Sequence, residues 1–205
     1  MYITRRMGRV AGMGGMQWAI DITKAVQEAG GMTSLWAGGP GSTPGTVAWS
    51  SMVDSFAAMV EFQDAITASP AYQALLAKAG DHVVSIEPDT LMQVVHGEIT
   101  GQAEVGSFLG AVNAVANPAR GMDAMAWAPS IADAWTAATG LPCVVVTNAA
   151  GPMSDIGWLV RFDSAAAIDA ANAKVAASAE YMEVYAGGAG LFESGGNQMY
   201  ARRIA

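Results

Sequence analysis

One sequence pattern occurs twice in the chain, and this repeat constrains the fold more than any other feature. Trp49 begins the stretch WSSMVDSFAA and Trp158 begins WLVRFDSAAA, so both read Trp-x-x-x-x-Asp-Ser-x-Ala-Ala. The two tryptophans are 109 positions apart (158 − 49 = 109), and at the same offset Trp18 matches Trp127. Because tryptophan is a rare residue, two such matches at one offset predict a duplicated unit.

The period of the repeat is far longer than that of a solenoid, so it predicts two copies of a domain-sized unit. We expect the first unit to span residues 1–100 and the second to span 101–205, with the join in HGEITGQAEVGSF. Segments rich in alanine and glycine can align by chance, but the matched Trp and Asp-Ser residues argue against that alternative.

The two halves predict the same order of elements. In each half a strand is followed by a helix, two strands joined by a Pro- and Gly-rich loop, a long helix and a last strand. Asp-Ser, at 54–55 and 163–164, is typical of a helix N-cap, and a helix break is expected before Pro70. The expected segments are 2–10, 16–30, 32–39, 46–53, 54–80 and 90–99, then 106–116, 125–140, 141–148, 155–162, 163 onward and 197–205.

The order β-α-β-β-α-β defines the ferredoxin-like unit, and it predicts the α+β fold class. The four-stranded antiparallel sheet of such a unit has helices on one face, so its other face needs a cover. A second copy in the same chain supplies that cover. We therefore expect two fused ferredoxin-like units whose antiparallel sheets close into one α/β barrel within a single chain.

The segments VAWSSMVDSFAAMVEFQDAITASPAYQALL and IGWLVRFDSAAAIDAANAKVAASAEYMEV resemble the dimeric α/β-barrel superfamily, in particular its NIPSNAP-like and antibiotic-biosynthesis-monooxygenase-like proteins. In those families two chains usually pair, so this chain looks like a tandem fusion of two units. The superfamily includes cofactor-free oxygenases, haem-binding enzymes, isomerases and proteins with no known chemistry. The resemblance therefore implies a pseudo-dimeric barrel without choosing among these activities.

Composition excludes several classes of partner. The chain is 52% hydrophobic and 14% charged, which is typical of a globular protein with a large core, and its formal net charge is −8. Such a charge disfavours nucleic acid and anionic membranes as partners. Arginines interrupt the N-terminal segment, no apolar stretch is long enough to span a membrane, and Cys143 is the single cysteine. We expect a soluble, cytoplasmic protein, and further self-association remains open.

The sequence predicts no cofactor and no metal site. His82 and His96 fall in different elements, and neither a Cys-x-x-Cys nor a His-x-x-x-His spacing occurs. The stretch AGMGGMQ lacks the third glycine of a dinucleotide fingerprint, so a turn into a helix explains it better. Cys143 lies in an apolar strand, which indicates a buried, inert thiol.

His96 is the candidate catalytic residue. Strand alternation predicts that it shares a face with Met92 and Val94, and its counterpart in the second half is Arg203. If that face is the barrel interior, His96 and Arg203 form an asymmetric polar site, with His96 as proton acceptor or hydrogen-bond donor; axial ligation of haem would be a special case. If that face meets the helices, His96 is an ordinary residue at a strand end.

Arg161, Arg203 and Trp36 are the candidate ligand-binding residues. Arg161 interrupts an apolar strand and so requires either a local ion pair with Asp163, which the spacing favours, or an anionic ligand. Trp36 has Val145 as its counterpart, so the repeat does not demand a tryptophan there. We expect Trp36 to form an apolar wall of a pocket.

These observations leave three functions open. The first is binding of a small apolar or aromatic molecule in the barrel, with no reaction assigned. The second is a cofactor-independent monooxygenase or isomerase that acts on an apolar or aromatic metabolite. The third is a structural or partner-binding module. A hollow barrel with convergent polar groups would favour the first two, and a barrel filled by side chains would favour the third.

Overall fold

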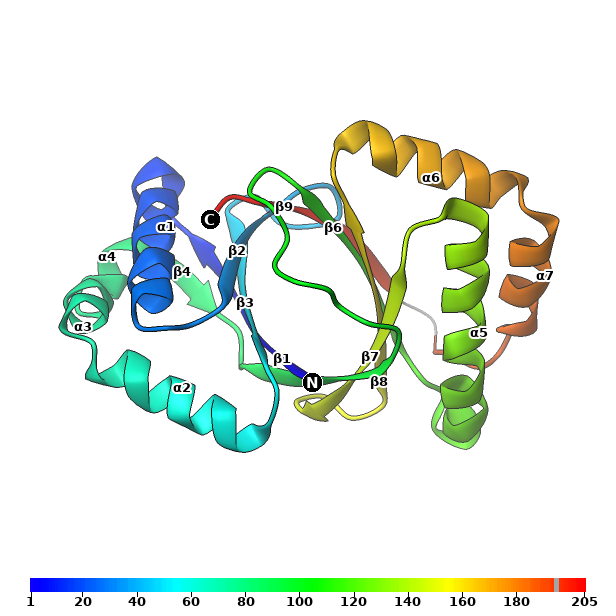
Figure 1. Cartoon of the computed structure of the whole chain (residues 1–205), viewed down its shortest axis with the longest axis horizontal. Helices are drawn as coiled ribbons and strands as arrows, with labels where there is room; N and C mark the ends of the chain where they lie inside the picture. The colour runs from blue at the N-terminus through cyan, green and yellow to red at the C-terminus, as the bar shows by residue number, and fades with distance from the viewer. Residues whose placement is uncertain (194–195) are drawn as a thin grey trace.

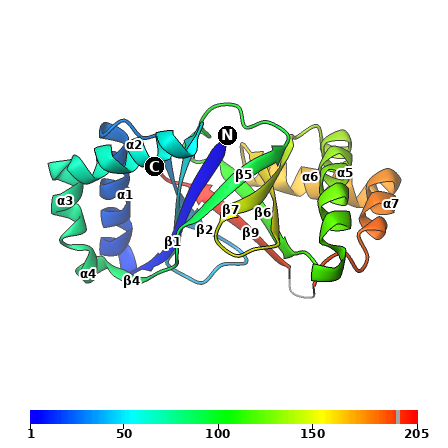
Figure 2. The same cartoon turned by 90° about the horizontal axis from the view of Figure 1, so that it is seen from below.

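A closed antiparallel β-barrel forms the centre of the molecule, with helices on two opposite sides (Figures 1 and 2). The computed structural model describes residues 1–193 and 196–205. Within these residues, eight strands close the barrel in the order β3-β2-β9-β6-β8-β7-β5-β1, because β1 also pairs with β3. The expected α+β class and the α/β barrel are therefore confirmed.

The first half of the chain supplies four barrel strands and one helical side. Its elements are β1 (Tyr2–Val10), α1 (Gly12–Glu28), β2 (Thr33–Gly38), β3 (Thr46–Val53), α2 (Phe56–Ala68), α3 (Pro70–Leu76), α4 (Ala79–His82), β4 (Val83–Ile86) and β5 (Thr90–His96). The short strand β4 pairs with β1 outside the closed ring. It was not expected from the sequence, in which a four-residue strand has no periodic pattern to recognise.

The second half supplies the other four strands and the opposite helical side (Figure 1). Its elements are β6 (Phe108–Val115), the 3-10 helix η1 (Pro118–Arg120), α5 (Gly121–Thr139), β7 (Cys143–Ala150), β8 (Asp155–Phe162), α6 (Ala165–Ala177), α7 (Ala179–Gly187) and β9 (Asn197–Arg203). The order of the main strands and helices repeats that of the first half.

The barrel closes because the last strand of each half pairs with a strand of the other half. β5 lies between β1 and β7, and β9 lies between β6 and β2. The antiparallel pairing of β9 continues beyond Arg203, since the Ile204 amide donates to the Leu35 carbonyl and the Leu35 amide donates to the Ala205 carbonyl. Neither four-stranded sheet is left with a free edge in the ring, which removes the open edges that promote aggregation.

Serine caps begin the outer helices of both halves. Ser55 accepts a hydrogen bond from the Ala58 amide at the start of α2, and Ser164 accepts one from Ala167 at the start of α6. Ser69 caps α3 directly before Pro70, so the helix break expected there is present. The Asp-Ser pattern is thus explained by capping, with serine as the capping residue in both copies.

The helix-facing cores of the two halves contain matching tryptophan contacts. Trp18 donates to the Leu75 carbonyl at 2.9 Å, and Trp127 donates to the Val184 carbonyl at 2.9 Å. Each ring packs edge-to-face on the tryptophan of the repeated pattern, Trp49 or Trp158. The acceptors are also 109 residues apart (184 − 75 = 109), so a buried indole N–H finds its partner at the same place in each half.

A β-bulge near the end of β5 changes the direction of its last side chain. Val94 pairs with Val146, whereas His96 pairs with the adjacent Val145, so the strand carries one extra residue at this point. Val94 packs inside the barrel, and Val145 belongs to the helix-facing core. The expectation that His96 shares the face of Val94 is therefore wrong, because a one-residue bulge reverses the alternation.

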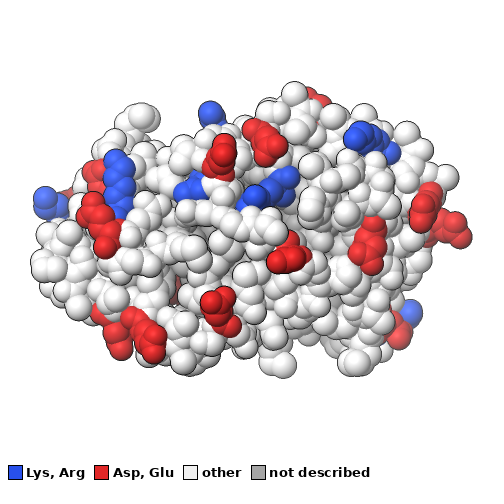
Figure 3. All heavy atoms as spheres, viewed as in Figure 1, with Lys and Arg blue, Asp and Glu red and all other residues white. Residues whose placement is uncertain are grey.

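None of the described helices is long and apolar enough to cross a membrane. On the face shown in Figure 3, lysine and arginine side chains are scattered among more numerous acidic ones, and no basic patch forms. This surface agrees with the net charge of −8 and offers no extended site for a polyanion.

Because strands of each half pair with strands of the other, we predict that one half of the chain does not fold into a stable monomer. A fragment of residues 1–100 keeps β5 and β2 but loses their partners β7 and β9. We expect this fragment to dimerise through the exposed edges or to aggregate, as measured by light scattering during size-exclusion chromatography. A stably folded monomeric fragment would contradict this account of the fold.

Candidate functional site

The barrel interior is hollow at both ends. The upper chamber, at the end crossed by the segment between β5 and β6, has a volume of about 330 Å³. Its walls are mostly apolar, with contributions from Ile3, Trp36, Leu109, Val144 and Leu159. Five methionines, Met7, Met32, Met52, Met92 and Met199, also line it. Such flexible thioether side chains let a cavity adapt to different ligand shapes.

The lower chamber, at the opposite end, is smaller and more polar. It has a volume of about 240 Å³, and its polar lining residues include Glu87, Asn113, Asn148, Asp155 and Asn197. Four residues line both chambers and mark the waist between them, namely Arg5, Met7, Met92 and Met199. The lumen therefore changes from apolar to polar along its length.

The segment that connects the two halves, residues 97–107, crosses the mouth of the upper chamber (Figure 1). Ile99 packs on the interior cluster around Ile3, and Ala103 packs on the interior cluster around Trp36. Gln102 donates to the Thr33 carbonyl at 3.0 Å. The connecting segment is thus fixed to opposite walls of the barrel and roofs the chamber.

Arg161 holds the connecting segment, residues 97–107, in place over the chamber. It extends from β8 into the lining of the upper chamber and donates to the carbonyls of Thr100 and Gly101 at 3.1 and 2.9 Å. Although Asp163 also lines the chamber, no ion pair joins it to Arg161 in the described part of the chain. The expected local ion pair is therefore wrong, since backbone carbonyls of a distant segment take its place.

Trp36 forms part of the wall, at the position expected for an apolar lining residue. It is buried in β2, and its indole N–H donates to the Ser50 hydroxyl at 2.9 Å. This hydrogen bond satisfies the polar end of the ring and leaves its apolar surface toward the chamber. Trp36 and Arg161 therefore line the same chamber.

Arg203 is buried at the same end of the barrel but does not line the chamber. It pairs with Trp36 across β9 and β2, and its Nε donates to the Ala205 carbonyl at 3.0 Å. Burial lowers the pKa of the Arg203 guanidinium below its ordinary value, and the like charge of Arg161 lowers it further. Two cationic groups thus lie close to each other near this mouth.

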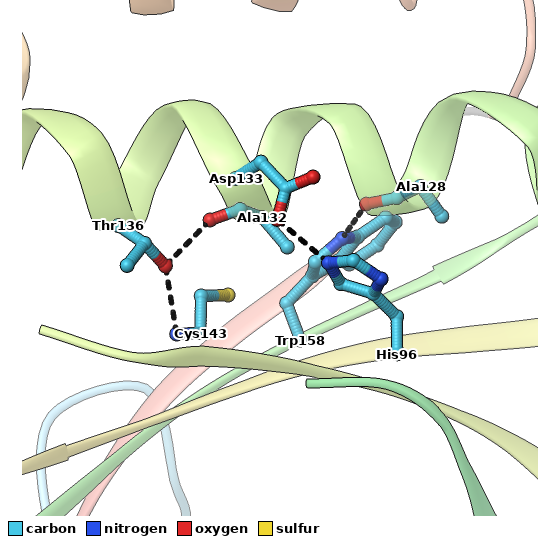
Figure 4. A network of polar contacts seen from close by, with 7 residues as sticks. All are labelled: His96, Ala128, Ala132, Asp133, Thr136, Cys143 and Trp158. Carbon is cyan, nitrogen blue, oxygen red and sulfur yellow. Dashed lines mark hydrogen bonds and ion pairs between the residues drawn. The ribbon is translucent and has the colours of Figure 1, made fainter. Parts of the chain in front are cut away.

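His96 lies outside the barrel, on the helix-facing side (Figure 4). Its Nε2 contacts the Asp133 carboxylate on α5 at 2.7 Å, and the Asp133 side chain is largely exposed. His96 is absent from the described lining of both chambers. The structure does not bring His96 together with Trp36 and Arg161, because the bulge in β5 turns it toward α5.

Cys143 is an inert thiol in the helix-facing core beside α5 (Figure 4). Burial raises its pKa to about 12, and the negative charge of Asp133 adds to this effect. Its backbone amide donates to the Thr136 hydroxyl at 3.2 Å. The thiol therefore stays protonated at neutral pH and cannot act as a nucleophile.

Arg5 is a charged residue of the lumen that sequence reasoning missed. It occupies the middle of β1 and lines both chambers. Burial lowers the pKa of its guanidinium below the ordinary value, and the carboxylates of Glu87 and Asp155 oppose that shift. Alternation in YITRRMGRV could have identified it, since Arg5 shares a strand face with the apolar Ile3 and Met7.

Two other features do not form a comparable site. Within the described residues, no group of three His, Cys, Asp or Glu side chains is placed to hold a metal ion. A groove of about 480 Å³ lies outside the barrel beside η1 and the start of α5, where Met122 is 84% exposed. This groove is more open to solvent than the upper chamber is, so the lumen is the better candidate for a specific ligand.

Known structures share this fold at low sequence identity. A protein from Fusobacterium nucleatum described as a putative monooxygenase superposes with a TM-score of 0.76 at 9% identity, over 100% of this chain and 92% of that one. An anthrone oxidase-like protein gives 0.69 at 12%, over 100% and 91%. A putative monooxygenase from Lactobacillus acidophilus gives 0.66 at 13%, over 98% and 93%. These structures therefore share the α/β-barrel fold that the sequence predicts for this chain.

A NIPSNAP domain protein from Burkholderia xenovorans matches 44% of this chain and 91% of its own at 13% identity, with a TM-score of 0.38 that is too low to carry an argument. No protein-family model matches the sequence, and the search of curated proteins found no match. At these identities the structural matches establish the shared fold and leave the activity open.

Loss of the Arg161 hydrogen bonds should loosen the roof of the chamber. Arg161→Met places the residue of the matching position, Met52, at this site and removes both bonds to the connecting segment. We expect several-fold faster cleavage by a glutamate-specific protease after Glu98 and Glu104, measured by mass spectrometry of timed digests. Arg120→Gln, which loses an exposed ion pair on the outside, is the control and should be cleaved at the native rate. Equal rates for all three proteins would contradict the fastening role.

Cys143 should be unreactive in the folded protein. Because its pKa is about 12, we expect no labelling by iodoacetamide at pH 8 until denaturant is added, as followed by mass spectrometry. Because folding raises the thiol pKa, the unfolded chain loses this proton at a lower pH than the native protein does. The contribution of the thiol to the free energy of unfolding therefore falls as pH rises from about 9 toward 12. Cys143→Ala should remove that part of the alkaline loss. Rapid labelling of the native protein would contradict the burial of this thiol.

Proposed function

We propose that this protein binds a small, largely apolar molecule inside the upper chamber of its barrel. The observation that carries the proposal is the partly enclosed volume of about 330 Å³, which is bounded by Trp36 and aliphatic side chains and roofed by residues 97–107. A chamber of this size, with apolar walls and a few polar groups, is typical of a site for a compact organic ligand. Trp36 supplies a flat surface against which an aromatic ligand can pack.

The roof gives the site a means of admitting and retaining a ligand. Residues 97–107 are held by a small number of hydrogen bonds, those from Arg161 and Gln102 among them. Gly97, Gly101 and Gly106 adopt positive φ angles of 76°, 61° and 98°, so the segment turns sharply at three places. Local opening at these turns would expose the chamber without disturbing the barrel strands.

A second candidate is a cofactor-independent monooxygenase or isomerase that acts on an apolar or aromatic metabolite. Its support is the pair of carboxylates, Glu98 and Asp163, that line the chamber at its mouth. A carboxylate close to a bound substrate can accept a proton. The histidine that sequence reasoning favoured for this task lies outside the lumen, so a proton-transfer role would pass to these two residues.

The third candidate, a purely structural module, has less support. A module of that kind has no need for an interior space, whereas this barrel contains two chambers at opposite ends. Protein interiors are otherwise packed with few voids larger than a water molecule. The retained volume therefore argues for an occupant.

We infer in addition that the barrel consists of two copies of one unit, residues 1–100 and 101–205. The inference is supported by the equivalent serine caps and by the tryptophan hydrogen bonds at the common offset. A cytoplasmic location, expected from the single cysteine, stays a prediction of the sequence.

Filling the upper chamber should abolish binding. Ala111 is buried and lines the chamber, so Ala111→Leu extends apolar atoms into it. We expect the affinity for naphthalene-2-methanol, a neutral aromatic probe, to fall at least about tenfold, which corresponds to about 1.4 kcal/mol, in a fluorescence titration. Val112→Leu, which alters an exposed neighbour on the same strand, is the control and should bind like the native protein. Native-like affinity of Ala111→Leu would place any bound probe outside the chamber.

A further inference from the structure

Arg5 is the charged side chain at the waist of the lumen. Of the four residues that line both chambers, the other three are methionines, so Arg5 supplies the charge at this level of the barrel. It lies in the middle of β1, opposite Ser50 of β3. A ligand in the upper chamber that reaches toward the waist must therefore meet this guanidinium.

The Arg5 guanidinium has no protein partner among the described residues. It takes part in none of their hydrogen bonds or ion pairs, whereas its neighbour Arg6, on the outer face, binds the Asp89 carboxylate at 2.6 and 2.7 Å. Arg5 is partly buried, so its guanidinium loses part of its hydration without a protein hydrogen bond to replace it. The chain therefore maintains an unfavourable charge inside a chamber, which is typical of a group that a ligand completes.

Space is available for a ligand group beside Arg5. Arg5 pairs with Ser50 in the first half, and Ala111 pairs with Leu159 in the second. Leu159 lies 109 residues after Ser50 (159 − 50 = 109), which is the offset of the repeat. Ala111 therefore occupies the place in the second half that Arg5 occupies in the first. A repeat would place side chains of equal size at these two positions. The small Ala111 side chain instead takes up less of the upper chamber, which both residues line, than a second arginine would.

The surrounding charges indicate from which side an anion would approach. Glu87 and Asp155 line the lower chamber and would repel it there. They attract Arg5 without contacting it, and burial outweighs that attraction, since the pKa of Arg5 is lowered. In the upper chamber, Arg161 and the nearby Arg203 add positive charge, although Glu98 and Asp163 lie near the mouth. An anion should thus reach Arg5 from the upper chamber.

From this geometry we propose that the ligand is a small organic acid, whose carboxylate binds the Arg5 guanidinium and whose apolar body fills the upper chamber against Trp36. This inference deepens the proposed function and rests on it. The planar guanidinium can donate two parallel hydrogen bonds to a carboxylate, which gives orientation as well as affinity. Arg5 is then the residue that selects an acid over a neutral molecule of the same shape.

The test compares two probes that differ in charge. 2-Naphthoate and naphthalene-2-methanol have the same ring system, and they carry a carboxylate and a neutral alcohol, respectively. We expect the native protein to bind 2-naphthoate at least about tenfold more tightly, a difference of about 1.4 kcal/mol. Arg5→Met should lose this preference while it retains the affinity for the alcohol. Titration calorimetry measures both affinities, and Arg6→Met, on the opposite face of the same strand, is the matched control that should keep the preference.

Thermal unfolding separates a binding role from a structural one. Because the partly buried Arg5 guanidinium has no hydrogen bond or ion pair in the described part of the chain, Arg5→Met should unfold at the same temperature as the native protein or at a higher one, with binding of 2-naphthoate lost. Equal affinities of the native protein for the two probes, or a preference that persists in Arg5→Met, would overturn this inference and leave the proposed function in place. Failure of the native protein to bind either probe would overturn both. A marked fall in unfolding temperature would show that Arg5 serves the fold instead.

Discussion

The pairing of each terminal strand with the opposite half holds the molecule together. β5 joins β7, and β9 joins β2, so two four-stranded sheets become one continuous ring. Antiparallel pairing fixes which side chains face inward, because alternation along each strand is then shared by its neighbours. Every wall of the lumen, and hence the shape and polarity of both chambers, depends on these two joints.

The fold could be predicted largely from the sequence, because its signals are local and are repeated. The serine caps and the two tryptophans of the repeated pattern mark helix starts and core positions in both halves, and each has the expected place in the structure. The strand β4 was not predicted, because tertiary pairing with β1 rather than a local pattern determines it.

The site was harder to predict, since it depends on contacts between distant segments. Strict alternation placed His96 on the strand face of Met92 and Val94, but one extra residue in β5 turns it outward to Asp133. Arg161 was expected to bind its neighbour Asp163, yet carbonyls some sixty residues earlier in the chain accept its hydrogen bonds. Neither a bulge nor a long-range backbone contact changes the periodicity of the sequence, so neither could be predicted from it. Trp36 lines the lumen as expected, because no bulge interrupts its short strand.

The segment that joins the halves has a consequence for symmetry. Two separate chains that formed such a barrel would contribute equal surroundings to the lumen, and neither would carry a covalent bridge. A single chain needs one connection, and here residues 97–107 cross one mouth of the barrel. Fusion therefore makes the two ends of the lumen different in the described structure, because the connecting segment covers only one of them. Each half is also free to acquire side chains that its copy does not share.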